Sequence, residues 1–253
     1  MNRILFEKGE IKDGVATFCG DRAEHVLNVL HGEVGQVLKT GEVGGPIGTS
    51  TILSIEQSEQ SNNLTIKVRC SHDQESRRPW VDLILAPPRP RVMKRLLPQL
   101  ATLGVGRIFL VGAKKVEKDF WGATLLKEEN YRPLLVDGLM QAGTSVLPTL
   151  EVRRNFRKFV KEELDGLFPT GTRIVAHPYG AKDARRETKD ACLASRVLRP
   201  CLAIGPEGGW TDEEVTLLEE HGFTRYSLGS RILRTDTATI ALLAQLMQVH
   251  DQA

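Results

Sequence analysis

The sequence predicts an α/β protein in which a parallel sheet with helices on both faces follows a small N-terminal β-barrel. Short strand-like runs, separated by glycines and by Asn62-Asn63, dominate the first 70 residues. From Trp80 onward, apolar runs alternate with helical stretches, which is typical of βα units. The polar residues 71–79 between the two regions are typical of a linker. We therefore expect two domains, at residues 1–72 and 78–253.

The first region is expected to contain several short strands and one helix, a pattern typical of a small barrel. The helix begins near Asp21, which can cap it, and Ala23, Val26, Leu27 and Leu30 form its apolar stripe. The strands are expected at Arg3–Phe6, Val15–Cys19, Val34–Lys39, Thr49–Glu56 and Leu64–Cys70.

The second region is expected to alternate strands with helices, as a parallel sheet requires. The strands are expected at Val81–Ala86, Arg107–Val111, Arg173–Ala176, Cys201–Ile204 and Arg225–Leu228. The helices are expected at Val92–Leu103, Lys127–Ala142, Phe156–Leu164, Asp212–His221 and Asp236–His250. Pro98 and Pro133 lie within two of these helical patterns, and we expect each to kink or shorten its helix.

The composition is that of an ordinary globular protein, with 253 residues and a net charge of +2. Global charge therefore does not indicate nucleic acid, although a local basic patch still can. Cys19, Cys70, Cys192 and Cys201 lie far apart, and no His/Cys spacing indicates a metal site. No segment resembles a signal peptide or a membrane span. We expect a cytoplasmic protein with reduced thiols, no metal and no membrane partner.

Two glycine-bearing loops near the C-terminus are the most informative part of the chain. Each follows an apolar run and precedes a helical pattern, and Thr211 with Glu214 forms a capping box after the first. Because open α/β sheets bind ligands at the carboxyl ends of their strands, we expect a ligand site where the loops meet. A Gly-Gly pair can also be only a tight turn before a helix. Neither loop is a Walker A motif, and Glu207 argues against a phosphate ligand.

The segments IGPEGGWTDEE and LGSRILRTDTA, followed by an apolar C-terminal helix, resemble the RsmE family of the SPOUT superfamily. The resemblance covers most of the chain. It implies an S-adenosylmethionine-dependent RNA methyltransferase (EC 2.1.1 class) that methylates N3 of a uridine in 16S ribosomal RNA of the small ribosomal subunit. It also implies a PUA-like, RNA-binding N-terminal domain, a deep trefoil knot in the SPOUT domain, and a homodimer.

The same resemblance implies roles for individual residues. It assigns the cofactor to the two loops and to a histidine at the end of the preceding strand: His177, Ile204, Gly205, Pro206, Glu207, Gly208, Gly209, Leu228, Gly229, Ser230, Ile232 and Leu233. A uridine that has lost its N3 proton is stabilised by a nearby cation, and a sulfonium tolerates a nearby carboxylate. The candidate catalytic residues are therefore Arg231, Arg234 and Glu207. Surface ion pairing of the arginines and simple packing of His177 are the alternatives.

Basic residues gather at the start of the second region, at Arg77, Arg78, Arg89, Arg91, Lys94 and Arg95. Next to the cleft of an enzyme that acts on nucleic acid, such a cluster contacts phosphate. A solvated charged surface is the alternative interpretation. We take these six residues as candidate RNA contacts.

The chain departs from the family at charges that are expected to face RNA. The arginines of the family's Arg-Val-Leu-Arg segment are replaced by Asn28 and His31, and a charged pair in the next domain by Gln99 and Thr102. The Glu-Gln-x-x-Arg motif becomes Met140–Thr144. Losing phosphate contacts weakens RNA binding. Three interpretations follow: the same uridine is methylated through other contacts, the methyltransferase has a different RNA target, or the chain is a dimeric RNA- or ligand-binding paralogue with lost or reduced activity.

Overall fold

The computed structural model describes residues 2–57, 64–169, 171–179, 182–183 and 199–251. The chain divides into two compact units, one made of residues 1–77 with 136–147 and the other of residues 78–135 with 148–253. The helix α3 (Glu128–Ala142) has its first half in the second unit and its second half in the first. Residues 136–147 thus pack with the N-terminal strands, a long-range association that the local sequence pattern did not indicate.

The N-terminal unit contains a six-stranded sheet of order β1-β4-β5-β6-β3-β2. Its elements are β1 (Ile4–Phe6), β2 (Ile11–Lys12), β3 (Val15–Cys19), α1 (Asp21–Asn28), β4 (Val37–Glu42), β5 (Ile47–Gln57) and β6 (Leu64–Gln74). Neighbouring strands are antiparallel, except for the parallel pair β1 and β4. Val26 of α1 shares one core with Phe6, Phe18 and Ile66. Because side chains alternate along a strand, the strand residues that do not point into this core lie on the outer face of the sheet.

The helix α1 differs from its expected form at both ends. Gly20 occupies the capping position and provides no side-chain hydrogen bond, so Asp21 is the first helical residue and not the cap. The helix ends at Asn28, and Leu30 lies beyond it with an exposed side chain. The apolar stripe expected from the sequence is therefore one turn too long.

Two strand boundaries in this unit also differ from expectation. The strand expected at Val34–Lys39 begins only at Val37, because Gly35 has a φ of +88° and turns the chain before it. Residues 71–74, which were expected in a linker, extend β6 by pairing with β5. Polar residues such as these are compatible with a strand whose side chains face solvent.

A polar cluster inside the N-terminal unit contains a histidine that resists protonation. The Nε2 atom of His72 lies 2.7 Å from Thr40 Oγ1, which in turn lies 2.6 Å from Ser50 Oγ. The imidazole also stacks on Phe6. Burial, followed by the positive charge of Arg3, lowers the pKa of His72 below its ordinary 6.5.

This cluster predicts a loss of stability on mild acidification. Below about pH 6.5 the unfolded chain binds a proton at His72 that the folded chain resists, so the free energy of unfolding should decrease as pH falls. The variant His72→Gln cannot titrate and should show a shallower pH dependence. Urea midpoints measured from about pH 5.5 to 8 test this. The same slope in both proteins would show that His72 does not contribute.

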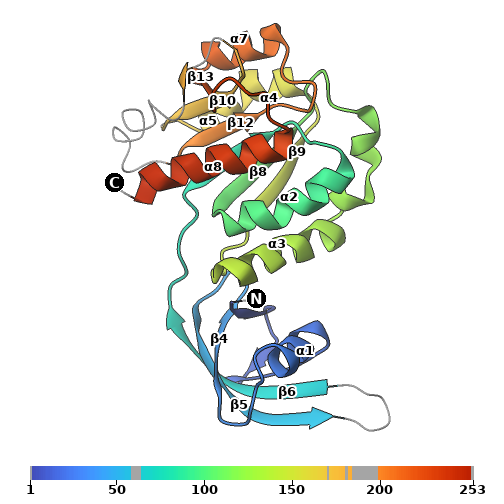
Figure 1. Cartoon of the computed structure of the whole chain (residues 1–253), viewed down its shortest axis with the longest axis vertical. Helices are drawn as coiled ribbons and strands as arrows, with labels where there is room; N and C mark the ends of the chain where they lie inside the picture. Colours follow the sequence, from blue (N-terminus) through green and yellow to red (C-terminus); the bar gives the residue numbers. More distant parts are fainter. Residues whose placement is uncertain (1, 58–63, 170, 180–181, 184–198, 252–253) are drawn as a thin grey trace. The chain divides into compact units, whose positions relative to one another are not determined.

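The C-terminal unit is a seven-stranded sheet of order β11-β13-β10-β12-β7-β8-β9, and all its strand pairs are parallel (Figure 1). The strands are β7 (Val81–Leu85), β8 (Val105–Val111), β9 (Thr149–Arg153), β10 (Arg173–Ala176), β11 (Lys182–Asp183), β12 (Cys201–Ile204) and β13 (Phe223–Ser227). The helices are α2 (Pro90–Thr102), α4 (Phe156–Glu162), α5 (Leu164–Leu167), α7 (Asp212–Glu220) and α8 (Thr235–Asp251), with short 3-10 helices η1 (Lys118–Gly122) and η2 (Thr124–Leu126).

Helices cover this sheet in two groups. α2 and α8 contact each other, and so do α4 and α7 (Figure 1). The central strands β7 and β12 are buried along their whole length, which is typical of a parallel sheet with both faces covered. The α/β fold expected for this region is confirmed. In the described part of the chain, no helix is long and apolar enough to cross a membrane.

Sequence signals for the ends of helices and strands were confirmed in some places and wrong in others. The capping box of Thr211 and Glu214 is present at the start of α7. Neither Pro98 nor Pro133 ends its helix. The helix expected at Phe156–Leu164 is divided into α4 and α5. The edge strand β9 was missed because its side chains are only partly buried and its sequence contains no continuous apolar run.

Candidate functional site

Three adjacent parallel strands end at the candidate site. β10 lies between β12 and β13 in the sheet, so the segments that leave these strands emerge at the same edge. Residues 177–179 follow β10, residues 205–211 follow β12, and residues 228–234 follow β13. The two glycine-bearing loops therefore lie side by side at the carboxyl ends of the strands, where open α/β sheets bind ligands.

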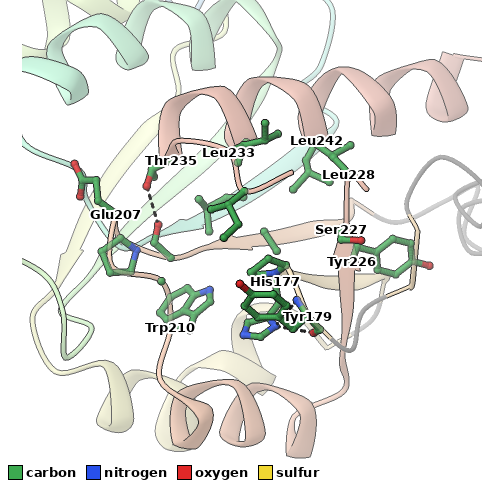
Figure 2. Close-up of a pocket in the computed structure, with 18 of the residues that line it drawn as sticks. His177, Tyr179, Glu207, Trp210, Tyr226, Ser227, Leu228, Leu233, Thr235 and Leu242 are labelled. Carbon is green, nitrogen blue, oxygen red and sulfur yellow. Dashed lines mark hydrogen bonds between the residues drawn. The ribbon is translucent and has the colours of Figure 1, made fainter. Parts of the chain in front are cut away.

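A pocket of about 460 Å³ lies between these loops and α8 (Figure 2). Its volume is within the range of small-molecule sites. Most of the expected cofactor residues line it, namely His177, Ile204, Gly205, Pro206, Glu207, Gly208, Gly209, Leu228, Gly229, Ile232 and Leu233. Ser230 does not line it and is exposed. Of the two candidate arginines, Arg231 lines the pocket and Arg234 does not.

Glycine is required at specific points of both loops. Gly209 has a φ of +68° and Gly229 a φ of +106°, conformations that other residues rarely adopt. A Cβ atom on Gly205 would lie 3.1 Å from the indole of Trp210. These backbone positions keep the loops compact and let their main chain form the pocket wall.

Side chains from outside the first loop donate hydrogen bonds to its carbonyl oxygens. Lys115, which follows β8, donates from Nζ to the carbonyl oxygen of Gly208 at 2.8 Å. Thr235, the first residue of α8, donates from Oγ1 to the carbonyl oxygen of Gly205 at 3.4 Å (Figure 2). The bond from Thr235 joins the end of one loop to the beginning of the other, so the two sides of the pocket are connected.

The pocket interior is mostly apolar and aromatic. Trp210 is 5% exposed and packs on Phe156 with ring centroids 5.2 Å apart. In Figure 2, His177 and Tyr179 lie across the pocket from Leu233. Apolar walls with main-chain polar groups at the rim suit a flat heteroaromatic ligand.

His177 is held by its own local turn. Its Nδ1 atom lies 2.8 Å from the carbonyl oxygen of Tyr179, and its backbone N–H donates to Tyr226 at 3.0 Å. The imidazole therefore lines the pocket in a fixed orientation. This geometry is compatible with both interpretations of the residue, a cofactor contact or a packed histidine at a strand end.

The carboxylate of Glu207 has a structural partner. Its Oε1 atom accepts a hydrogen bond from the backbone N–H of Arg89 at 3.0 Å, immediately before α2. A carboxylate is favourable at the positive end of a helix. Figure 2 shows the side chain on the opposite side of the drawn residues from Tyr226. Glu207 thus joins the first loop to α2, a role that the sequence did not indicate.

The candidate RNA contacts fall into two groups. Arg89 forms a 2.8 Å ion pair with Glu117, which raises the pKa of Arg89, and Arg95 lies 3.6 Å from Asp236 of α8. The remaining candidates are exposed and have no carboxylate within 4 Å among the described residues: Arg77, Arg78, Arg91 and Lys94. Only this second group presents unneutralised cations.

The positions that depart from the family have diverse surroundings. Asn28, His31, Gln99 and Thr102 are exposed. The side chain of Met140 is buried in the N-terminal unit. The hydroxyl of Thr144 lies 2.8 Å from that of Ser76 in the same unit.

Several pocket residues were not identified from the sequence. They are Lys115, Ala176, Pro178, Tyr179, Trp210, Asp212, Tyr226, Ser227, Thr235, Ala238 and Leu242. Trp210 and Thr235 border the two loops and could have been included on that ground. Lys115 and Leu242 reach the pocket only through the tertiary fold. Among the described residues, no three His, Cys, Asp or Glu side chains are grouped as a metal site requires.

Comparisons with known proteins agree with this architecture. A family model described as an RNA methyltransferase domain matches residues 74–247. A ribosomal RNA small subunit methyltransferase E of Treponema pallidum is 29% identical over 98% of this chain and 91% of that protein. One of Borreliella burgdorferi is 24% identical over 95% of each chain.

A solved structure shares the whole fold. The ribosomal RNA small subunit methyltransferase E of Neisseria gonorrhoeae, bound to S-adenosylmethionine, has a TM-score of 0.71 and 21% identity, with 98% of each chain covered. At this identity the likeness concerns the fold.

Proposed function

The chain belongs to the family of RNA methyltransferase domains, and from this premise we propose that it transfers a methyl group from S-adenosylmethionine to N3 of a uridine in 16S ribosomal RNA. The observation that carries the proposal is the pocket between the two glycine-bearing loops. The resemblance to ribosomal RNA small subunit methyltransferase E proteins over nearly the whole chain supports the ribosomal substrate.

The residues of the pocket are suited to S-adenosylmethionine. Apolar side chains of Ile204, Leu233 and Leu242 provide surfaces for a flat adenine, and the loops provide main-chain donors and acceptors. Gly205 leaves room for the indole of Trp210, which lines the same pocket. The carbonyl oxygen of Ile204 also accepts a hydrogen bond from Ala86, which fixes the start of the loop.

Bound S-adenosylmethionine supplies an electrophilic methyl group on a sulfonium. The remaining requirement is a uridine N3 that has lost its proton and whose negative charge spreads onto the neighbouring carbonyl oxygens. Arg231 lines the pocket, is exposed, and has no carboxylate partner among the described residues. A guanidinium in that position stabilises the developing anion and can also hold a phosphate. We assign this function to Arg231.

The finer features implied by the resemblance are part of the same proposal. We propose a SPOUT-type trefoil knot around the second loop, a PUA-like N-terminal domain that binds RNA, and a homodimer. Ile232 is 72% exposed and Tyr179 is 65% exposed at the pocket rim, and apolar surface of this kind is what a second copy would cover. Sedimentation of the purified protein measures the oligomeric state.

Reverse transcription of ribosomal RNA tests the reaction. Methylation of N3 blocks the Watson–Crick edge, so primer extension stops at the modified uridine. Deleting the gene should remove one stop in 16S RNA, and the wild-type gene should restore it. An unchanged stop map, combined with S-adenosylmethionine binding by the purified protein, would indicate a different RNA target. Failure to bind the cofactor would favour a non-enzymatic paralogue.

The contact made by Lys115 should affect cofactor binding. The variant Lys115→Met keeps the aliphatic part of the side chain but loses the hydrogen bond to Gly208. We expect the Kd for S-adenosylmethionine to increase about tenfold, which corresponds to the loss of one charge-assisted hydrogen bond. Calorimetry measures this change. Lys114→Met is the matched control, and equal Kd values in both variants would exclude a role for the Gly208 contact.

A further inference from the structure

The outer face of the N-terminal sheet carries cations that the proposed function does not yet use. Strand alternation exposes Lys12 of β2, Lys39 of β4, and Lys67 and Arg69 of β6. Val68, which lies between Lys67 and Arg69, and Leu38, which precedes Lys39, are buried in the core. The four cations therefore share the face that is opposite to the core.

The strand register places three of these cations in one area. Arg69 pairs with Val15, which in turn pairs with Lys12, so Lys12 and Arg69 lie two strands apart, or about 10 Å. Lys67 precedes Arg69 by two residues on the same face, about 7 Å along the strand. Such spacings allow the three side chains to contact a single polyanion.

Hydroxyl groups stand beside three of the cations, on neighbouring strands. Lys67 pairs with Thr17, and Arg69 pairs with Thr51. Lys39, on the next row, pairs with Thr49. Threonine and serine hydroxyls, with lysine and arginine, are the side chains that most often contact phosphate oxygens.

Acidic side chains do not neutralise the centre of this face. Within the residues that the structure describes, no carboxylate lies within 4 Å of the four cations. Glu56 pairs with Thr65, one row from Lys67 on the same face, and Asp73 lies near the far end of β6. Neither carboxylate forms an ion pair with these cations, so the face keeps a net positive charge around Arg69.

The surface around α1 has the opposite character. Its exposed Asn28 and His31 stand where the family has arginines, and Glu24 and Glu33 nearby are exposed. Arg22 is paired with Glu10 at 2.7 Å. This surface offers little attraction to phosphate, so cationic contacts from this unit must come from elsewhere.

We propose that the outer sheet face, defined by Lys12, Lys39, Lys67 and Arg69, binds the phosphate backbone of the RNA substrate. The inference rests on the proposed function and adds an RNA contact surface to it. Neutralising phosphates releases counterions, so binding through this face depends on salt. An acidic protein segment is the alternative occupant, but the threonine hydroxyls beside three of the cations favour phosphate.

A triple variant tests the proposal. In Lys39→Gln/Lys67→Gln/Arg69→Gln all substituted side chains are exposed, so the fold should be preserved. The matched control replaces three exposed lysines of the other unit, Lys127→Gln/Lys158→Gln/Lys161→Gln. Binding to a 16S ribosomal RNA transcript is measured by fluorescence anisotropy from about 0.05 to 0.3 M salt. Calorimetric titration with S-adenosylmethionine shows whether each variant keeps its cofactor site, and the double variant Lys67→Gln/Arg69→Gln provides a milder change.

The expected result is a Kd for RNA about tenfold or more higher in the triple variant, with the slope of log K against log salt reduced by about 2. The control should bind RNA like the wild type, and all proteins should bind S-adenosylmethionine equally. Wild-type RNA affinity and slope in the triple variant would overturn the proposal. Polyglutamate stands in for an acidic protein segment and is titrated in the same way. If the triple variant loses binding to polyglutamate but keeps wild-type binding to RNA, the proposal is also overturned. If the wild type itself neither binds nor methylates the RNA, the proposed function fails, which is a distinct outcome.

Discussion

Replacing Arg231 with alanine should lower kcat/KM for RNA methylation about 100-fold or more, the usual effect of removing one group that stabilises a developing anion. The guanidinium lines the pocket and has no carboxylate partner among the described residues, so it is available to a substrate. Because it acts on the uridine and not on the adenosyl group, the Kd for S-adenosylmethionine should change by less than about threefold. Transfer of a radiolabelled methyl group to ribosomal RNA measures the rate.

Arg234→Ala is the matched control for this prediction. Arg234 lies on the same loop, is similarly exposed, and does not line the pocket. Its replacement should cost less activity than that of Arg231. Equal losses in the two variants would show that pocket position does not distinguish the arginines, and a larger loss for Arg234 would contradict the assignment of the catalytic cation to Arg231.

Replacing Asp82 with alanine should destabilise the protein by about 1–3 kcal/mol, the usual cost of leaving buried hydrogen-bonding groups without their partner. Asp82 is 0% exposed and receives hydrogen bonds from the guanidinium of Arg107 at 2.7 Å and of Arg199 at 3.1 Å. It also accepts the backbone N–H of Arg107 at 2.9 Å. Alanine would leave two neighbouring guanidinium groups and a buried N–H without their acceptor.

Urea unfolding followed by tryptophan fluorescence measures this change. Glu219→Ala is the control, because Glu219 pairs with Arg225 at 2.7 Å on the surface, where such a pair contributes no more than about 1 kcal/mol. Asp82→Asn keeps the shape and one acceptor and should be intermediate. A cost for Asp82→Ala no larger than that of Glu219→Ala would contradict the inference that the buried cluster stabilises the sheet.

The location of the pocket could be predicted because its signals are local. Gly209 and Gly229 adopt conformations that favour glycine, and Thr211 with Glu214 forms the capping box that the sequence indicated. Parallel strands then bring their carboxyl ends together whatever the details of packing. Local rules of this kind identified the two loops without any knowledge of the tertiary structure.

The remaining features depend on partners far along the chain. Lys115 is 93 residues from Gly208, whose carbonyl it binds. Glu207 is 118 residues from Arg89, and its use as a helix-capping group could not be deduced from the loop itself. The pairing of Arg89 with Glu117 could not be predicted either. Glu117 lies just before the short helix η1, whose residues follow no clear periodic pattern, so its position in the fold was not evident.

The edge strand β9 and the end of β6 were also difficult to predict from the sequence. β9 has side chains that are exposed or half-buried, so it has neither the continuous apolar run of a central strand nor a clear alternation. Residues 71–74 are polar because they lie at the end of β6, yet their backbone pairs with β5. Main-chain hydrogen bonds form without apolar side chains. Prediction from hydrophobic periodicity detects only apolar side chains, so it misses such segments.

Calorimetric titration with S-adenosylmethionine tests most directly whether the pocket between the two loops is the cofactor site. Ala238 of α8 lines this pocket, and Ala238→Trp would fill part of its volume. The wild type should bind one cofactor per chain, and the variant should bind at least about tenfold more weakly with an unchanged circular dichroism spectrum. No binding by the wild type, or equal binding by a folded Ala238→Trp protein, would contradict the account.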